Sequence, residues 1–132
     1  MNETNYQIIS FSGLNAKGYN VDYSSINFGH APFNGLIAEL EPGACSHIHN
    51  HFEVECFLFL SGNGVVKVND EKVVVGPGVG IRVSAFVNHI IENTSQTEAL
   101  RFLSLYWGDK LSDLPQLTAN TLPHENRRNP CS

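Results

Sequence analysis

Five side chains able to bind metals or transfer protons are clustered in one short segment, residues 43–55, with the sequence GACSHIHNHFEVE. Three of the six histidines of the chain and two glutamates occupy every second position of its second half. Residues two apart in a β-strand point to the same face of the sheet. Phe57 and Phe59 continue the same series, which indicates that this face points toward a core. The five side chains are those of His47, His49, His51, Glu53 and Glu55.

Buried imidazoles and carboxylates need partners, so this pattern predicts a metal site rather than a solvated polar stripe. Histidine and carboxylate ligands together suit a divalent first-row ion, such as Fe, Mn, Ni or Zn. Three imidazoles and one carboxylate leave two positions of an octahedral ion open for a chelating substrate, or for a substrate with dioxygen. A divalent ion with one glutamate keeps a net positive charge, which favours an anionic oxygen ligand. Spacing alone does not choose among the five residues.

Two glycines flank the segment at distances that do help to choose. Gly43, His49, His51, Glu55 and Gly62 have the spacing of the first motif of the cupin superfamily, with every position matched. This part of the chain therefore resembles a cupin.

A second cupin motif is expected further along the chain. Its glycine, histidine and asparagine are matched by Gly78, His89 and Asn93, whereas Ser84 and Phe86 stand where the family has a proline and a glycine. The turn before His89 is therefore expected to differ from that of the family.

The resemblance covers roughly residues 34–107. It implies a small single-domain cupin with an all-β fold, an antiparallel jelly-roll (double-stranded β-helix) barrel. It also implies that Asn93 forms a turn rather than binding the ion. The implied ligands of one divalent transition metal ion make a 3-His-1-Glu site, namely His49, His51, Glu55 and His89.

An alternative register remains for the first motif, because His47, His49 and Glu53 have the same internal spacing. Gly43 and Gly62 then stand at the wrong distances, so we favour the later register. In that register His47 is either a residue beside the ligands or a surface histidine at a strand start. Glu53 is either an acceptor that orients an imidazole or a solvent-exposed glutamate.

Three further residues are candidates for substrate binding. Arg82 and Arg101 lie on predicted strands, where an inward arginine would bind a substrate carboxylate with two hydrogen bonds and an outward one would be only a surface charge. Tyr106 is a candidate for closing the site, although aromatic residues at such positions more often build a core.

The surrounding sequence is typical of an all-β sandwich or barrel. Short apolar runs alternate with Gly, Pro and Asn clusters, and no convincing helical period occurs between residues 34 and 107. Residues 1–27 are mixed and polar, and residues 108–132 are polar with three prolines, so both segments are expected to be peripheral parts of one domain, 1–132. The predicted strands cover residues 35–40, 54–60, 65–68, 72–75, 81–83, 89–92 and 99–107.

Composition excludes several classes of partner. Apolar residues make up 42% and charged residues 16%, which is typical of a compact globular protein. The net charge of −5 and the lack of any Lys or Arg run argue against nucleic acid and membrane partners. No secretory leader or membrane-spanning run is visible, so a cytoplasmic location is expected. Cys45, Cys56 and Cys131 form no CxxC pair, which favours reduced thiols.

These observations favour a metal-dependent enzyme that acts on a small oxygen-rich or carboxylate-bearing metabolite, with dioxygenase-type oxidation preferred. A metal-dependent isomerase or lyase is one alternative, because the fold alone selects no reaction. A non-catalytic cupin that binds a sugar or another metabolite is the other. The resemblance also implies a homodimer, since cupins often pair their barrels through an edge strand or the N-terminal segment. No catalytic residue is assigned.

Overall fold

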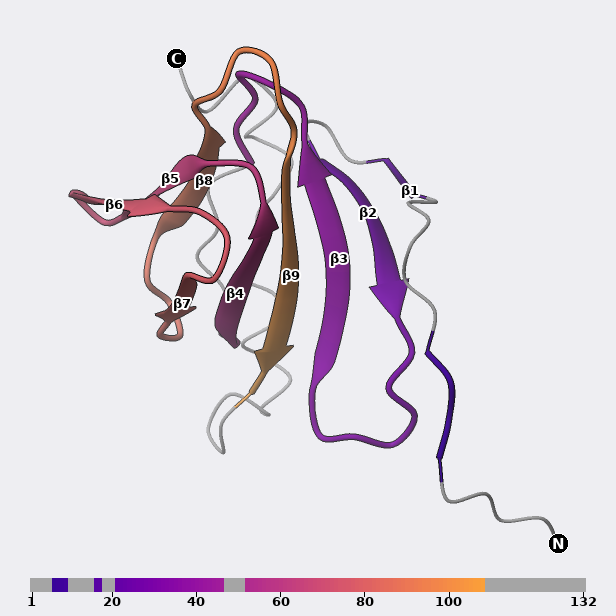
Figure 1. Cartoon of the computed structure of the whole chain (residues 1–132). Coiled ribbons are helices and arrows are strands. Elements are labelled where there is room, and N and C mark those ends of the chain that lie inside the picture. Colours follow the sequence, from indigo (N-terminus) through magenta and orange to yellow (C-terminus); the bar gives the residue numbers. More distant parts are fainter. Residues whose placement is uncertain (1–5, 10–15, 18–20, 47–51, 109–132) are drawn as a thin grey trace, which may run out of the picture.

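A computed structural model describes residues 6–9, 16–17, 21–46 and 52–108 of the chain. All regular elements in these ranges are β-strands (Figure 1). They are β1 (Ala16–Lys17), β2 (Val21–Ile26), β3 (Asn34–Leu40), β4 (Val54–Ser61), β5 (Gly64–Val68), β6 (Glu71–Val75), β7 (Gly80–Val83), β8 (His89–Asn93) and β9 (Leu100–Trp107).

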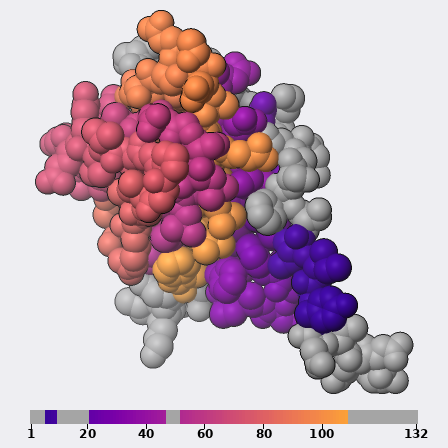
Figure 2. Space-filling view, viewed as in Figure 1, coloured from indigo at the N-terminus to yellow at the C-terminus, as the bar shows by residue number. Residues whose placement is uncertain are grey.

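The strands form two antiparallel sheets that face each other (Figure 1). The larger sheet has the order β1-β2-β3-β9-β4-β7, and the smaller has the order β6-β5-β8. In Figure 2 the pink atoms of β5 and β6, two strands of the smaller sheet, lie on the left of the visible face. The arrangement is that of a jelly-roll barrel, which confirms the expected fold class.

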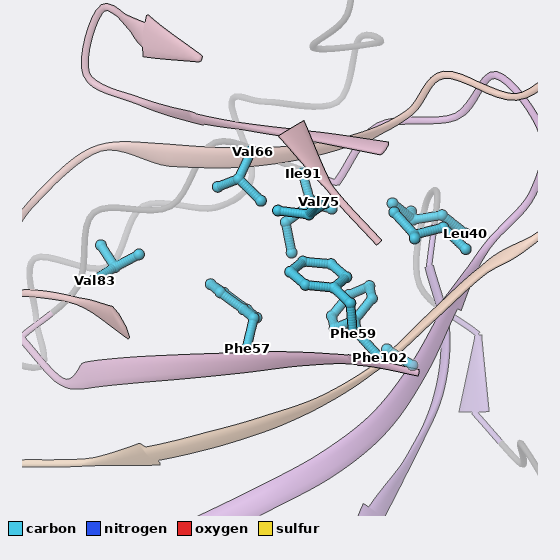
Figure 3. Close-up of a cluster of buried hydrophobic side chains, with 10 residues drawn as sticks. Leu40, Phe57, Phe59, Val66, Val75, Val83, Ile91 and Phe102 are labelled. Atoms are coloured by element: carbon cyan, nitrogen blue, oxygen red, sulfur yellow. The ribbon is translucent and has the colours of Figure 1, made fainter. Parts of the chain in front are cut away.

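The hydrophobic core lies between the two sheets (Figure 3). Phe57 and Phe59 of β4 and Phe102 of β9 extend from the larger sheet, and their rings lie 5.5–6.5 Å apart by centroid. Val66 of β5 and Ile91 of β8 meet them from the smaller sheet. Alternate residues of β4 therefore point inward, as the predicted face of Phe57 and Phe59 requires.

All seven predicted strands are present, with ends that differ by a residue or so. Two strands were missed, the two-residue β1 and the longer β2, because both lie in a segment expected to be peripheral. The larger contribution to the sheet is that of β2. Its sequence, VDYSSI, contains aspartate and two serines, which have low strand propensity. Hydrogen bonding to β3 along its whole length nevertheless makes it part of the larger sheet, with Ile26 and Ser24 buried.

The motif glycines Gly43, Gly62 and Gly78 all have positive φ angles, of 78°, 86° and 89°. Only glycine adopts this conformation without steric strain. At Gly62 an added Cβ would also lie 2.2 Å from the carbonyl oxygen of Ala99. The spacing of these glycines therefore reflects the turns that end β3 and β4 and precede β7.

Residues 43–46 run beside β8 as an additional short strand-like segment. Cys45 forms a β-bridge with Glu92, and the amide of Ser46 donates a hydrogen bond of 2.8 Å to the carbonyl of Ile91. Because the pairing is antiparallel, the chain here runs toward His89, the first residue of β8.

The expectation of reduced thiols is wrong for Cys45. This residue is fully buried and disulfide-bonded, whereas Cys56 is a free cysteine. Within the described ranges no helix is long and apolar enough to cross a membrane.

Candidate metal centre

Glu55 and His89 face each other across the two sheets. Glu55 is the second residue of β4, and His89 is the first residue of β8. Their side chains meet with Nε2 of His89 lying 3.3 Å from Oε1 of Glu55. Both residues are buried, with exposed fractions of 8% for Glu55 and 3% for His89. Two of the four predicted ligands, 34 positions apart in sequence, are thus brought together.

The tautomer of His89 is set by its own loop. Nδ1 of the ring lies 2.9 Å from the carbonyl oxygen of Val87. A carbonyl oxygen can only accept, so Nδ1 carries a hydrogen and donates it. A neutral His89 ring therefore has its lone pair on Nε2, the atom that faces Glu55. Such a hydrogen bond at the distal nitrogen is typical of histidines that bind metals.

The second carboxylate oxygen of Glu55, Oε2, accepts a hydrogen bond. Oγ of Ser104, on β9, donates a hydrogen bond of 2.5 Å to Oε2 of Glu55. Ser104 is fully buried, with an exposed fraction of 1%. With Oε2 engaged in this way, Oε1 is the oxygen directed toward His89.

The chemistry of this pair fits a bound cation. An ionised carboxylate and the lone pair of a neutral imidazole are both acceptors, so they attract each other only through a cation between them, either a ring proton or a metal ion. Two ligands that each lie about 2.1 Å from one ion are separated by about 3.0–3.4 Å. The observed 3.3 Å between Nε2 of His89 and Oε1 of Glu55 matches this separation.

The surroundings of the pair are apolar on the core side. The ring of Phe57 packs against the imidazole of His89, with centroids 5.6 Å apart. Phe57 also belongs to the hydrophobic core shown in Figure 3. Low polarity around Glu55 and His89 strengthens any electrostatic interaction that they make.

Tyr106 lies on the same face of the larger sheet as Glu55, because the two are cross-strand partners on β9 and β4. Burial, the carboxylates of Glu53 and Glu55, and the phenol of Tyr23 all raise the pKa of Tyr106 above its ordinary value of 10.0. Tyr106 therefore keeps its proton at neutral pH and is a hydrogen-bond donor beside the site. Glu53 itself is half-buried and immediately precedes β4.

The two arginine candidates are not brought to this site. Arg82 pairs with Cys56 and Arg101 with Ser61 in the larger sheet. Cys56 is adjacent to Glu55 and so points to the opposite face, which also places Arg82 there. Arg101 alternates with the buried inward residues Leu100 and Phe102 and likewise points outward. Of the two orientations considered, both arginines adopt the outward one.

His47, His49 and His51 lie outside the described residues. The described part of the chain contains no group of three or more His, Cys, Asp or Glu side chains able to hold an ion. Ser46 and Glu53, described residues before and after these positions, contact or influence neighbours of Glu55 and His89. Ser46 is bonded to Ile91, two residues from His89, and Glu53 is close enough to act on Tyr106.

The second motif contributes turns as well as the predicted ligand His89. The side-chain amide nitrogen Nδ2 of Asn93 lies 2.9–3.0 Å from the carbonyl oxygens of Leu40, Glu41 and Glu98, so its two hydrogens are shared among three acceptors. This confirms that Asn93 has a structural role. Phe86, at the position where the family has glycine, takes a φ of 64° and is half-exposed.

Ser104 was missed by the sequence analysis. The sequence carried only part of the signal, a serine within the apolar run of β9 between Phe102 and Tyr106, because both faces of this strand are apolar and the inward face is not evident from alternation. A polar residue at such a position needs a buried partner.

The two facing antiparallel sheets define the class of this protein, a small jelly-roll β-barrel in which Glu55 and His89 lie close together. The family model for the cupin domain matches residues 36–106, more than half of the chain. The protein therefore belongs to the cupin family, as the two motifs indicated.

Solved structures agree with this assignment. The plu4264 protein from Photorhabdus luminescens is 26% identical, with a TM-score of 0.69, over 83% of this chain and 92% of the other. A predicted oxalate decarboxylase from Thermotoga maritima is 26% identical, with a TM-score of 0.62, over 67% and 81%. A Cupin 2 conserved barrel domain protein from Salinispora arenicola is 18% identical, with a TM-score of 0.69, over 85% and 95%. A search of curated proteins gave no match.

Proposed function

We propose that this protein is a metal-dependent cupin enzyme that acts on a small oxygen-rich or carboxylate-bearing metabolite. The observation that carries the proposal is the 3.3 Å approach of Nε2 of His89 to Oε1 of Glu55, two buried acceptors suited to sharing a cation. The proposed ligands of one divalent Fe, Mn, Ni or Zn ion are His49, His51, Glu55 and His89.

A divalent ion supplies Lewis acidity and orients a chelating ligand when it is bound. The described residues prepare the site for it. The carbonyl of Val87 keeps the lone pair of His89 on Nε2, and Ser104 keeps Oε1 of Glu55 directed toward it. The protonated phenol of Tyr106 donates a hydrogen bond to an oxygen-rich ligand beside the ion.

Support for a carboxylate substrate comes from two sources. A divalent ion with one carboxylate ligand keeps a net positive charge, which attracts anionic oxygen. One structural relative, from Thermotoga maritima, is described as a predicted oxalate decarboxylase and is 26% identical. Within this class we propose dioxygenase-type oxidation first, with lyase or isomerase chemistry as the alternative on the same ligands.

A second candidate function is non-catalytic binding of a sugar or a similar metabolite. The observation that favours it is the outward orientation of Arg82 and Arg101. Neither guanidinium faces Glu55, so neither is in place to pair with a substrate carboxylate, and an uncharged polyol would not require one.

The first experiment is elemental analysis of freshly purified protein, followed by thermal melting with added Fe, Mn, Ni or Zn. We expect close to one transition metal ion per chain and a higher Tm with added metal. His49→Ala should abolish both, whereas the exposed His30→Ala should change neither. Protein that contains no metal and whose Tm does not respond to any of the four ions would overturn the proposal.

Activity then separates the two candidate functions. A metal-loaded protein that converts a chelating metabolite, screened from small carboxylates and enols, supports the enzyme. A metal-loaded protein that is stabilised by a sugar but shows no turnover with any of these compounds supports the binding protein.

A further inference from the structure

Ser104 lies directly beside the carboxylate of Glu55. The two residues belong to neighbouring strands of the larger sheet, where Ser104 is the cross-strand partner of Phe57, two residues from Glu55. Diagonal neighbours of this kind come within reach of each other when one side chain is long. The contact is a hydrogen bond of 2.5 Å from Oγ of Ser104 to Oε2 of Glu55.

The donor is well placed to fix one orientation of the carboxylate. The distance falls in the range of strong hydrogen bonds between hydroxyl groups and ionised carboxylates. Ser104 is 1% exposed, so bulk water does not compete for its hydroxyl hydrogen. Holding Oε2 limits rotation of the carboxylate and leaves Oε1 as the oxygen that faces Nε2 of His89.

We propose that Ser104 is a positioning residue, which makes Glu55 present a single oxygen, Oε1, to a bound ion. This inference rests on the proposed function and assigns a role to a residue outside the cupin motifs. A purely structural role is the competing explanation, in which Ser104 only satisfies a buried carboxylate. The two differ in one respect: only a positioning role changes how the folded protein binds the ion.

The test begins with zinc affinity, measured by competition with a chelating dye on the full chain after metal removal. Ser104→Ala should weaken zinc binding about ten- to a hundred-fold, as expected when a hydrogen-bonding partner of a metal ligand is lost. Ser104→Cys, which keeps a weak donor of similar size, should recover part of the loss. Ser24→Ala is the matched control, because Ser24 is a buried serine on β2 of the same sheet, on the face opposite Glu55.

The second measurement is the visible absorption of the protein saturated with Co²⁺. Affinity does not matter at saturation, so altered bands in Ser104→Ala report altered coordination by Glu55. Zinc affinity within twofold of the wild type, or unchanged Co²⁺ bands, would overturn the positioning role. Wild-type protein that binds neither ion would instead overturn the proposed function itself.

Discussion

Glu55 and Tyr106 are cross-strand partners, and their side chains share the inner face of the larger sheet. Because the Glu55 carboxylate is negatively charged, it disfavours ionisation of the Tyr106 phenol in the same buried space. This is one physical reason why the pKa of Tyr106 is raised, together with burial, which is the largest cause, and the carboxylate of Glu53.

We expect the stability of the metal-free protein to fall as pH rises above the ordinary phenol pKa of 10.0. A raised pKa means that the folded protein holds the Tyr106 proton more tightly than the unfolded chain does. The corresponding stability is complete below that ordinary value and is lost as pH rises through the higher folded value. Urea denaturation between about pH 8 and pH 11 measures this loss.

Tyr106→Phe should flatten this alkaline loss, because the variant has no phenol to ionise. The exposed Tyr6→Phe serves as its control. An equally steep loss in Tyr106→Phe and in the wild type would show that other groups cause the alkaline instability.

Gly62 and Gly78 offer a matched pair for testing the motif glycines. Both have positive φ angles, of 86° and 89°, but only Gly62 has a neighbouring atom where a Cβ would go, the carbonyl oxygen of Ala99 at 2.2 Å. Gly78→Ala should cost about 1–2 kcal/mol of unfolding free energy from backbone strain alone. Gly62→Ala should cost about 1–3 kcal/mol more, because backbone atoms must also move. Chemical denaturation measures both, and equal losses would argue against the steric explanation.

We propose that the homodimer expected from the family uses the outer face of β4 near the edge strand β7. Leu58 and Leu60 alternate with the buried Phe57 and Phe59 and are 37% and 45% exposed. Leu58 is also the cross-strand partner of Gly80 in β7. Leu58→Lys should convert the dimer to a monomer in analytical ultracentrifugation, because a buried lysine charge is costly.

Val74→Lys provides the control for this experiment, since Val74 is 78% exposed on β6 of the smaller sheet and should leave the dimer intact. A Leu58→Lys protein that remains dimeric would place the interface elsewhere. A wild-type protein that is monomeric at all concentrations would overturn the dimer itself.

The strands of the core were predictable because apolar runs separated by Gly, Pro and Asn have few other solutions. Strand β2 was not predictable, because its sequence is polar and its strand conformation depends on pairing with β3. The pairing of Glu55 with His89 followed from motif spacing. The contact of Ser104 with Glu55 did not follow from motif spacing. It depends on the register of β9 against β4, and the spacing of residues along one strand does not reveal that register.

The direction of Arg101 was not predictable for a different reason. Its neighbours on both faces of β9, Phe102 and Leu103, are apolar, so alternation could not identify the inner face. The positive φ of 64° at Phe86 was likewise not predictable, because a bulky side chain rarely adopts a left-handed backbone.

Glu55 belongs to the larger sheet and His89 to the smaller one. An ion shared by them would cross-link the two layers of the barrel in the folded state, a constraint that the unfolded chain lacks. A bound ion would then resist separation of the two sheets. Amide hydrogens at the β4 and β8 ends of the barrel should exchange more slowly as the ion concentration rises.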